Sequence, residues 1–355
     1  MENPSPNPDS VGRSPLLARL ILTTLALLGI LLVSLVGATL IPLTPPPGVI
    51  LRSIWNGLLG RINPQTAAGP ELIGWGFRVP RVMLGAIVGG SLAMAGATFQ
   101  GLLMNPLADP YLIGVSAGAA VGAALAILLG LSGALGGIGT GVLAFAAGLA
   151  TIFVVYRLAM RNGRVSLEAF LLAGVVVGSF MWAGVTVIMS IARPNDLQAV
   201  VAWLMGHLYD PPTPLVMWLI LAAIVAASIG IYSYARDLNL LALGEEPAKQ
   251  LGVEVERLKK IIIVLGSLVT AAAVSVSGII AFVGLIIPHI ARRIVGPDHR
   301  ILLPASALIG ASFLVWADAL ARGVISAEFP VGVITSLLGA PFFCYLLRRR
   351  PGGSG

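Results

Sequence analysis

Long, almost uncharged runs of apolar residues are the feature of this sequence that most limits its fold. Most runs have about 18 to 26 residues, the length that a helix needs to cross roughly 30 Å of hydrocarbon. Strands of a membrane barrel would instead alternate over about ten residues. Because only helices and closed barrels satisfy the backbone in lipid, the runs predict spanning helices. They lie at roughly 17–41, 80–103, 111–131, 135–159, 167–192, 213–235, 261–276, 278–291, 302–321 and 330–347.

The composition supports this prediction. Hydrophobic residues make up 57% of the chain and charged residues only 10%, against about 25% charged residues in soluble domains. The net charge of +7 is spread over short connections, which is typical of membrane topology and not of a nucleic-acid partner. We therefore expect an all-α integral membrane protein of about ten spans. One transmembrane domain, 16–350, lies between tails at 1–15 and 351–355.

Charge distribution predicts the orientation. Basic residues flank both ends of the uncharged stretch 261–288, so it should cross twice or re-enter, with a break near Ser275-Val276-Ser277-Gly278. With that choice, 16 Lys and Arg residues fall on one side and 6 on the other. Both termini are then expected in the cytoplasm. We interpret the first apolar run, Leu20 to Ile41, as a span and not as a signal peptide.

Spaced glycines predict close helix packing, as in Gly85-x-x-x-Gly89 and Gly174-x-x-x-Gly178, and in a third set at 114, 118 and 122. Ionisable residues are nearly missing from the central portions of the apolar runs. The exception is Asp318, which we expect to pair with Arg322 one turn later, with a proton relay as the alternative. The lone cysteine, Cys344, excludes an intramolecular disulfide framework.

The chemistry of an enzyme or of a self-powered pump is not visible. His207, His289 and His299 lack Glu-x-x-His spacing, so we expect no metal site and no resident cofactor. The chain has no Gly-Lys pair and therefore no P-loop. A membrane enzyme would need paired histidines or a carboxylate cluster, and an ion-coupled secondary carrier would need coupling-ion ligands at mid-membrane. Energy for transport would have to come from a partner.

The segment 236–260 is predicted to be more than a turn. Glu245, Glu246 and Pro247 favour a helix start and Gly252 favours its end. This predicts an exposed amphipathic helix of about two turns. By default such a helix is solvent-exposed or part of an interface. In a transporter it can also transmit movement from a partner to the membrane spans.

Several motifs, in order along the chain, resemble those of the FecCD permease family of ABC importers. The matching segments are Arg78-Val79-Pro80-Arg81, Gly96-Ala97-Thr98-Phe99-Gln100 with Asn105-Pro106-Leu107-Ala108-Asp109-Pro110, Leu243-Gly244-Glu245-Glu246, Phe282-Val283-Gly284-Leu285-Ile286-Ile287-Pro288-His289, Gly296-Pro297-Asp298-His299-Arg300, and Pro330-Val331-Gly332-Val333-Ile334-Thr335 with Gly339-Ala340-Pro341. The resemblance implies a type II importer permease with ten spans per subunit. It also implies a homodimer in the lipid of a prokaryotic cytoplasmic (inner) membrane, two ATPase subunits that bind the ATP, and an external substrate-binding protein.

The resemblance further implies three sets of site residues. Coupling to the ATPase would use Gly244, Glu245, Glu246, Pro247, Ala248 and Gly252. The cytoplasmic gate would use Asn105, Leu107, Leu167 and Glu168. Docking of the binding protein would use Arg78, Arg81 and Arg322. The implied substrate is a metal chelate. An iron-siderophore is expected on family frequency, with haem and cobalamin as alternatives.

Overall fold

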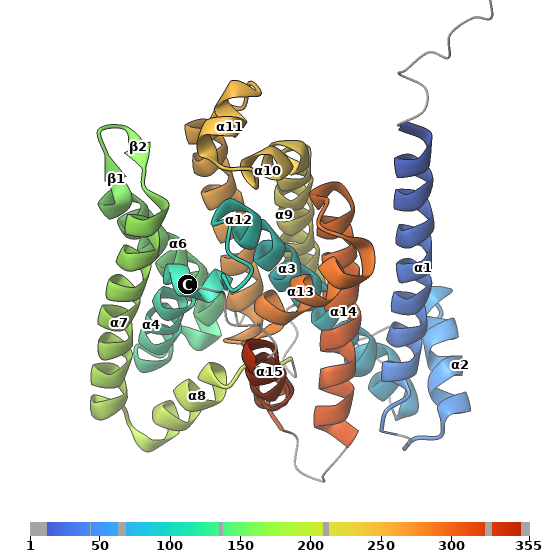
Figure 1. Cartoon of the computed structure of the whole chain (residues 1–355). Coiled ribbons are helices and arrows are strands. Elements are labelled where there is room, and N and C mark those ends of the chain that lie inside the picture. The colour runs from blue at the N-terminus through green and yellow to red at the C-terminus, as the bar shows by residue number, and fades with distance from the viewer. Residues whose placement is uncertain are drawn as a thin grey trace, which may run out of the picture.

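The computed structural model describes residues 13–42, 44–62, 69–134, 138–208, 213–323 and 329–348, and its ribbon is almost entirely helical (Figure 1). The longer helices are α1 (Arg13–Thr39), α3 (Val79–Leu102), α4 (Val115–Leu128), α6 (Gly139–Ala159), α7 (Leu167–Ile191), α9 (Pro214–Ser233), α12 (Val255–Ser277), α13 (Val283–Val295), α14 (His299–Gly323) and α15 (Val331–Arg348). Shorter elements are α2 (Pro47–Leu58), the π-helix η1 (Leu72–Arg78), the 3-10 turns η2 (Pro110–Ile113) and η3 (Leu131–Gly133), α8 (Pro194–Leu204), α10 (Ala235–Leu241), α11 (Glu245–Gln250), and strands β1 (Met160–Arg161) and β2 (Arg164–Val165).

Each of the ten predicted apolar runs folds as a helix. Seven helices among the described residues are long and apolar enough to span a membrane, and α4 and α15 are shorter apolar helices. The remaining run forms α13, which has 13 residues. The predicted all-α membrane fold is therefore confirmed. The predicted tails lie mostly outside the described residues, although α1 already begins at Arg13.

The core of the bundle is built around α3. In its most apolar stretch 78% of the residues are buried, against 6% in α1, which lies at the edge of the bundle (Figure 1). Glycine permits the tight packing of α3. A Cβ at Gly89 would lie 2.3 Å from the carbonyl oxygen of Gly310, and one at Gly96 would lie 1.9 Å from that of Gly284. Side chains at these positions would force α14 and α13 away, as the predicted packing role of spaced glycines requires.

The predicted break in the stretch 261–288 is present. Helix α12 ends at Ser277, Gly278 follows with φ +66°, and α13 begins only at Val283. At 13 residues, α13 is about 20 Å long, shorter than the hydrocarbon layer. The non-helical backbone between the two helices is satisfied inside the protein: the Tyr111 hydroxyl donates to the carbonyl of Ile280 at 2.9 Å and accepts from its N–H at 3.1 Å. Such compensation is what irregular backbone within a membrane needs.

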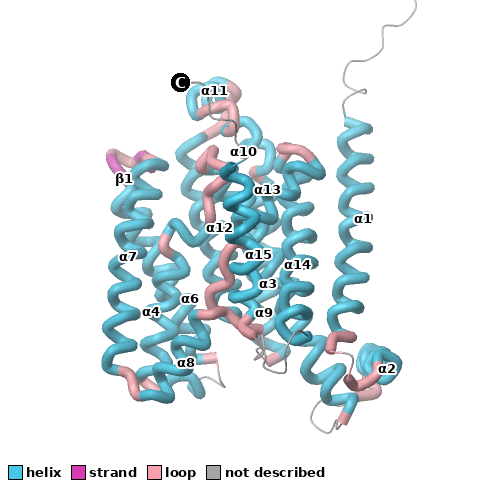
Figure 2. The backbone as a smooth tube through the Cα atoms, turned by 60° about the horizontal axis from the view of Figure 1, so that its bottom comes forward, coloured by secondary structure: helices cyan, strands magenta, loops and turns pink. Residues whose placement is uncertain are grey.

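The connections separate to the two ends of the bundle. The hairpin β1–β2, α10 and α11 lie at one end, which is also where α1 begins, and α2 and α8 lie at the other (Figures 1 and 2). Figure 2 views α2 along its axis while α1 runs across the view, so the two helices cross at a large angle. The arrangement matches the predicted division of loops between two sides. Helix α2, helix α8 and the hairpin themselves were not predicted.

Candidate functional sites

Helix α11 forms where the sequence predicts it. It begins at Glu245, directly after Gly244 with φ +113°, and ends at Gln250, before Gly252 with φ +88°. Acidic residues at its start and Lys249 at its end complement the helix dipole. The Lys249 ammonium lies 2.6 Å from the Glu246 carboxylate and lowers the pKa of that group. Ala248 is fully buried against the main core cluster, whereas Glu246 and Pro247 are exposed. One face of α11 is therefore anchored and the other is open.

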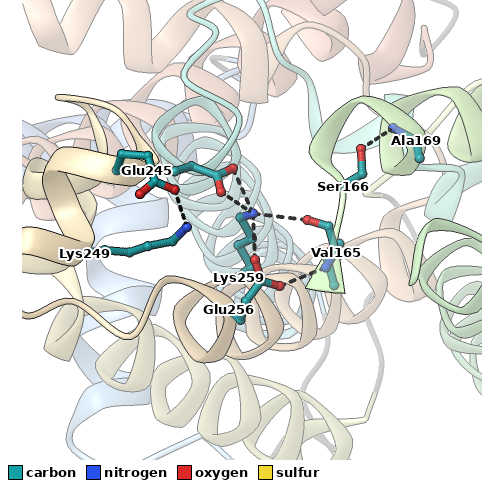
Figure 3. A network of polar contacts seen from close by, with 8 residues as sticks. Val165, Ser166, Ala169, Glu245, Lys249, Glu256 and Lys259 are labelled. Carbon is teal, nitrogen blue, oxygen red and sulfur yellow. Dashed lines mark hydrogen bonds and ion pairs between the residues drawn. The ribbon is translucent and has the colours of Figure 1, made fainter. Parts of the chain in front are cut away.

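The anchored side of α11 leads to a buried lysine. Lys259, on the first turns of α12, has only 2% of its surface exposed. Its ammonium lies 2.8 Å from Glu245 and 3.1 Å from Glu256, and it donates to the carbonyl oxygen of Val165 at 3.1 Å (Figure 3). The three N–H bonds of the ammonium thus meet three acceptors, each on a different element. We call Val165, Glu245, Glu256 and Lys259 the Lys259 network.

Glu256 completes the network on the side of the hairpin. Its second carboxylate oxygen accepts the backbone N–H of Val165 at 2.8 Å. Both backbone polar groups of Val165 are therefore held by α12 side chains, while the Val165 side chain is buried in the core. Breaking a buried ion pair from one side typically costs about 3–5 kcal/mol. The network therefore fixes α11, the start of α12 and the end of the hairpin relative to one another.

The predicted gate residues Leu167 and Glu168 follow Val165 of the Lys259 network after one intervening residue, Ser166. Ser166 caps α7 by accepting the N–H of Ala169 at 3.3 Å. Leu167 packs partly against the main core cluster, and Glu168 is exposed in the first turn of α7. The structure thus connects this half of the predicted gate to the predicted coupling helix through Val165 and Lys259.

The other predicted gate residues lie after α3. The side-chain oxygen of Asn105 accepts the backbone N–H of Leu107 at 2.9 Å, which closes a tight turn. Asn105 lines a cavity of about 700 Å³ together with Gln100, Arg292 and His299. The Gln100 amide ties this cavity to α13, since its oxygen accepts from Arg292 at 3.2 Å. Of the four predicted gate residues, Asn105 is the one that lines this cavity.

A second charged cluster surrounds Asp318 and lies on the side of the bundle that carries α2. Arg81 on α3 donates to both carboxylate oxygens at 3.0 and 3.2 Å, and Arg322 donates to one of them at 2.9 Å. Asp318 is 2% exposed. The predicted pairing of Asp318 with Arg322 is therefore confirmed. Both guanidinium groups are directed into the bundle.

Arg322 of this cluster, together with the neighbouring Arg78, also holds the end of α1 and the loop that follows it. Arg78 donates to the carbonyl oxygens of Thr39 at 3.1 Å and Thr44 at 2.7 Å. Arg322 donates to the carbonyl oxygens of Ala38 and Ile41. The bonds to Ala38 and Thr39 reach carbonyl oxygens at the end of α1, where helical partners run out, and those to Ile41 and Thr44 hold the loop itself. The contacts of Arg78, Arg81 and Arg322 within the chain favour a structural role for these side chains. Docking of the binding protein by the three arginines stays a prediction.

Sequence reasoning selected Glu245 but missed its partner Lys259 and the two further partners of Lys259, Glu256 and Val165. The available signal was the i,i+3 spacing of Glu256 and Lys259 on one helix face. That spacing alone is common on exposed helices. The third partner, Val165, lies 94 residues away from Lys259, so the network is visible only in the folded chain.

Comparisons with known proteins agree with this architecture. A cobalamin import system permease protein of Halobacterium salinarum is 47% identical over 81% of this chain and 75% of its own length. A hemin transport system permease protein of Yersinia pestis is 41% identical over 78% of this chain and 84% of its own. The solved structure of a metal-chelate type ABC transporter in an inward-facing conformation superposes with a TM-score of 0.78 at 30% identity, over 93% of this chain and 99% of that one.

These matches define the class of protein as a multi-pass membrane permease of the ABC importer type. The model of the FecCD transport family matches residues 25–349. The chain belongs to this family.

Proposed function

We propose that the chain is the membrane-spanning subunit of an ATP-driven importer and that its own residues carry no hydrolytic chemistry. The observation that carries this proposal is α11, a short helix with one anchored and one open face, in a chain without a P-loop. An exposed helix of this kind suits contact with a separate ATPase. Family membership supports the same assignment.

The proposed assembly has two copies of this chain, two ATPase subunits at the α11 end and a substrate-binding protein at the α2 end. The charge distribution favours the α11 end as the cytoplasmic one, since the topology predicted from sequence assigns 16 of the 22 Lys and Arg residues to that side. The location that follows is a prokaryotic cytoplasmic membrane with both termini inside.

The proposed substrate is a metal chelate of the tetrapyrrole type, with cobalamin as the first candidate. The relative that is 47% identical is a cobalamin import permease. Haem is the second candidate, because a hemin permease is 41% identical. The iron-siderophore expected on family frequency stays a prediction, and neither of these two relatives supports it.

Two experiments test the proposal. First, the tagged chain is purified from its native membrane, and an ABC ATPase should co-purify in equal amount. Second, the assembly in proteoliposomes, with ATP inside and binding protein outside, should accumulate labelled cobalamin. Parallel uptake of labelled hemin and of a ferric siderophore identifies the substrate. If no ATPase co-purifies and uptake of all three follows an ion gradient, the chain is a secondary carrier.

A further inference from the structure

We infer that Lys259 is a positioning residue that links α11 mechanically to the first turn of α7. The inference rests on the proposed function, because it assigns the route by which a displacement of α11 reaches the predicted gate residues. Lys259 contacts three elements that are separate in the chain: α11 through Glu245, its own helix through Glu256, and the hairpin through Val165 (Figure 3).

The connection from Lys259 to α7 is short and stiff. Both backbone polar groups of Val165 are hydrogen-bonded to α12 side chains: its carbonyl oxygen accepts from Lys259, and its N–H donates to Glu256. One residue, the helix cap Ser166, separates Val165 from Leu167. The hairpin behind Val165 closes through Asn162 and Gly163, both with positive φ, and pairs Met160 with Val165. The end of the hairpin therefore has little freedom to move independently of α12.

The connection from Lys259 to α11 is equally direct. Glu245 is the first residue of α11, and its two oxygens lie 2.8 Å from the Lys259 ammonium. Ala248 is the one buried residue of α11, and it packs into the main core cluster. A push on the exposed face of α11 therefore moves Glu245, and the ion pair passes that movement to Lys259 and Val165.

A purely structural role for Lys259 would have a different consequence. In that case the lysine would only neutralise two partly buried carboxylates, and its loss would lower stability without changing how α11 and the hairpin move together. The test must therefore measure the relation between the two segments as well as transport.

The matched variants are Lys259→Met and Lys260→Met. The two lysines are adjacent and carry the same charge, but Lys259 is buried and Lys260 is exposed. Lys259→Arg keeps the cation and serves as the rescue variant, and Glu245→Gln weakens the same link from the other side. Spin labels at Gln250→Cys on α11 and Arg161→Cys on the hairpin, both exposed positions, in a Cys344→Ala background, report the distance between the segments.

With Lys259 present, the distribution of distances between the labels at positions 250 and 161 should keep one narrow peak. This should hold in the isolated chain and in the assembly with and without ATP. Lys259→Met should broaden the distribution and lower the amount of substrate transported per ATP severalfold, because movement of α11 would no longer be passed on to Val165. Lys260→Met should change neither quantity, Lys259→Arg should restore the narrow distribution, and Glu245→Gln should have an intermediate effect.

A Lys259→Met chain that folds, keeps a narrow distribution and transports as efficiently as Lys260→Met would overturn the inference. If Lys259→Met does not fold, Glu245→Gln decides by the same two measurements. Failure of the proposed function looks different, because the unmodified chain would then bind no ATPase. The label distance in the isolated chain still tests the link in that case.

Discussion

Arg81 on α3 and Asp318 on α14 form a two-point ion pair between residues that lie 237 positions apart in the chain. Arg322 shares the same carboxylate from within α14. One buried anion therefore serves two partly buried cations that come from two of the central helices. Removing the anion would take the Asp318 counter-charge away from both guanidinium groups.

Asp318→Asn should therefore lower the free energy of unfolding by about 3–5 kcal/mol, the usual effect of removing one partner from a buried ion pair. The unfolding midpoint of the detergent-solubilised protein measures this loss. Glu254→Gln is the control, because its pair with Arg257 is exposed and 3.5 Å long, and such pairs contribute about 0–1 kcal/mol. Equal midpoints for the two variants would contradict the role given to Asp318.

The Arg78 side chain should act through the loop after α1. Arg78→Gln withdraws two hydrogen bonds from the carbonyl oxygens of Thr39 and Thr44, and each buried acceptor left unsatisfied costs about 1–3 kcal/mol. We expect a lowered unfolding midpoint and little direct change in affinity for the binding protein. An unchanged midpoint together with weaker, salt-dependent binding would assign Arg78 to docking instead.

Glycine packing predicts opposite results at two positions. Gly89→Ala places a methyl group 2.3 Å from the Gly310 carbonyl oxygen, whereas Gly29 has no atom within 4 Å of its added Cβ. Alanine is the better helix former by about 1 kcal/mol, so Gly29→Ala should keep or raise the unfolding midpoint. Gly89→Ala should lower it, because α3 and α14 must separate. Thermal unfolding of both variants in the same detergent checks the sign.

The orientation is testable with single cysteines. Arg61→Cys and Lys249→Cys, both at exposed positions, are placed in a Cys344→Ala background because Cys344 is itself exposed. A membrane-impermeant thiol reagent added to intact cells should label the cysteine at 61 and reach the one at 249 only after the membrane is opened. Labelling of both from outside would reject the proposed topology.

The spans could be predicted from sequence because length and apolar composition are local properties. The same holds for α11, whose start at Glu245 and end before Gly252 follow from residues within eight positions of each other. Helix α2 was missed because its 12 residues are fewer than a span needs and carry a charge. The direction of Arg78 could not be predicted either, since spacing places a side chain on a helix face but does not reveal which backbone carbonyls lie opposite.

The contacts at Gly89 and Gly96 also restrict how the protein changes shape. At both places the α3 backbone lies so close to a neighbouring backbone that a Cβ atom would not fit, which restricts movement of α13 and α14 relative to α3. Interfaces packed in this way deform by whole steps and not continuously. We therefore expect the three helices to move together as one rigid unit. Any movement that opens the pathway is then expected to involve helices other than these three, and α7, at the far side of the bundle from α1 (Figure 1), carries the predicted gate residues Leu167 and Glu168.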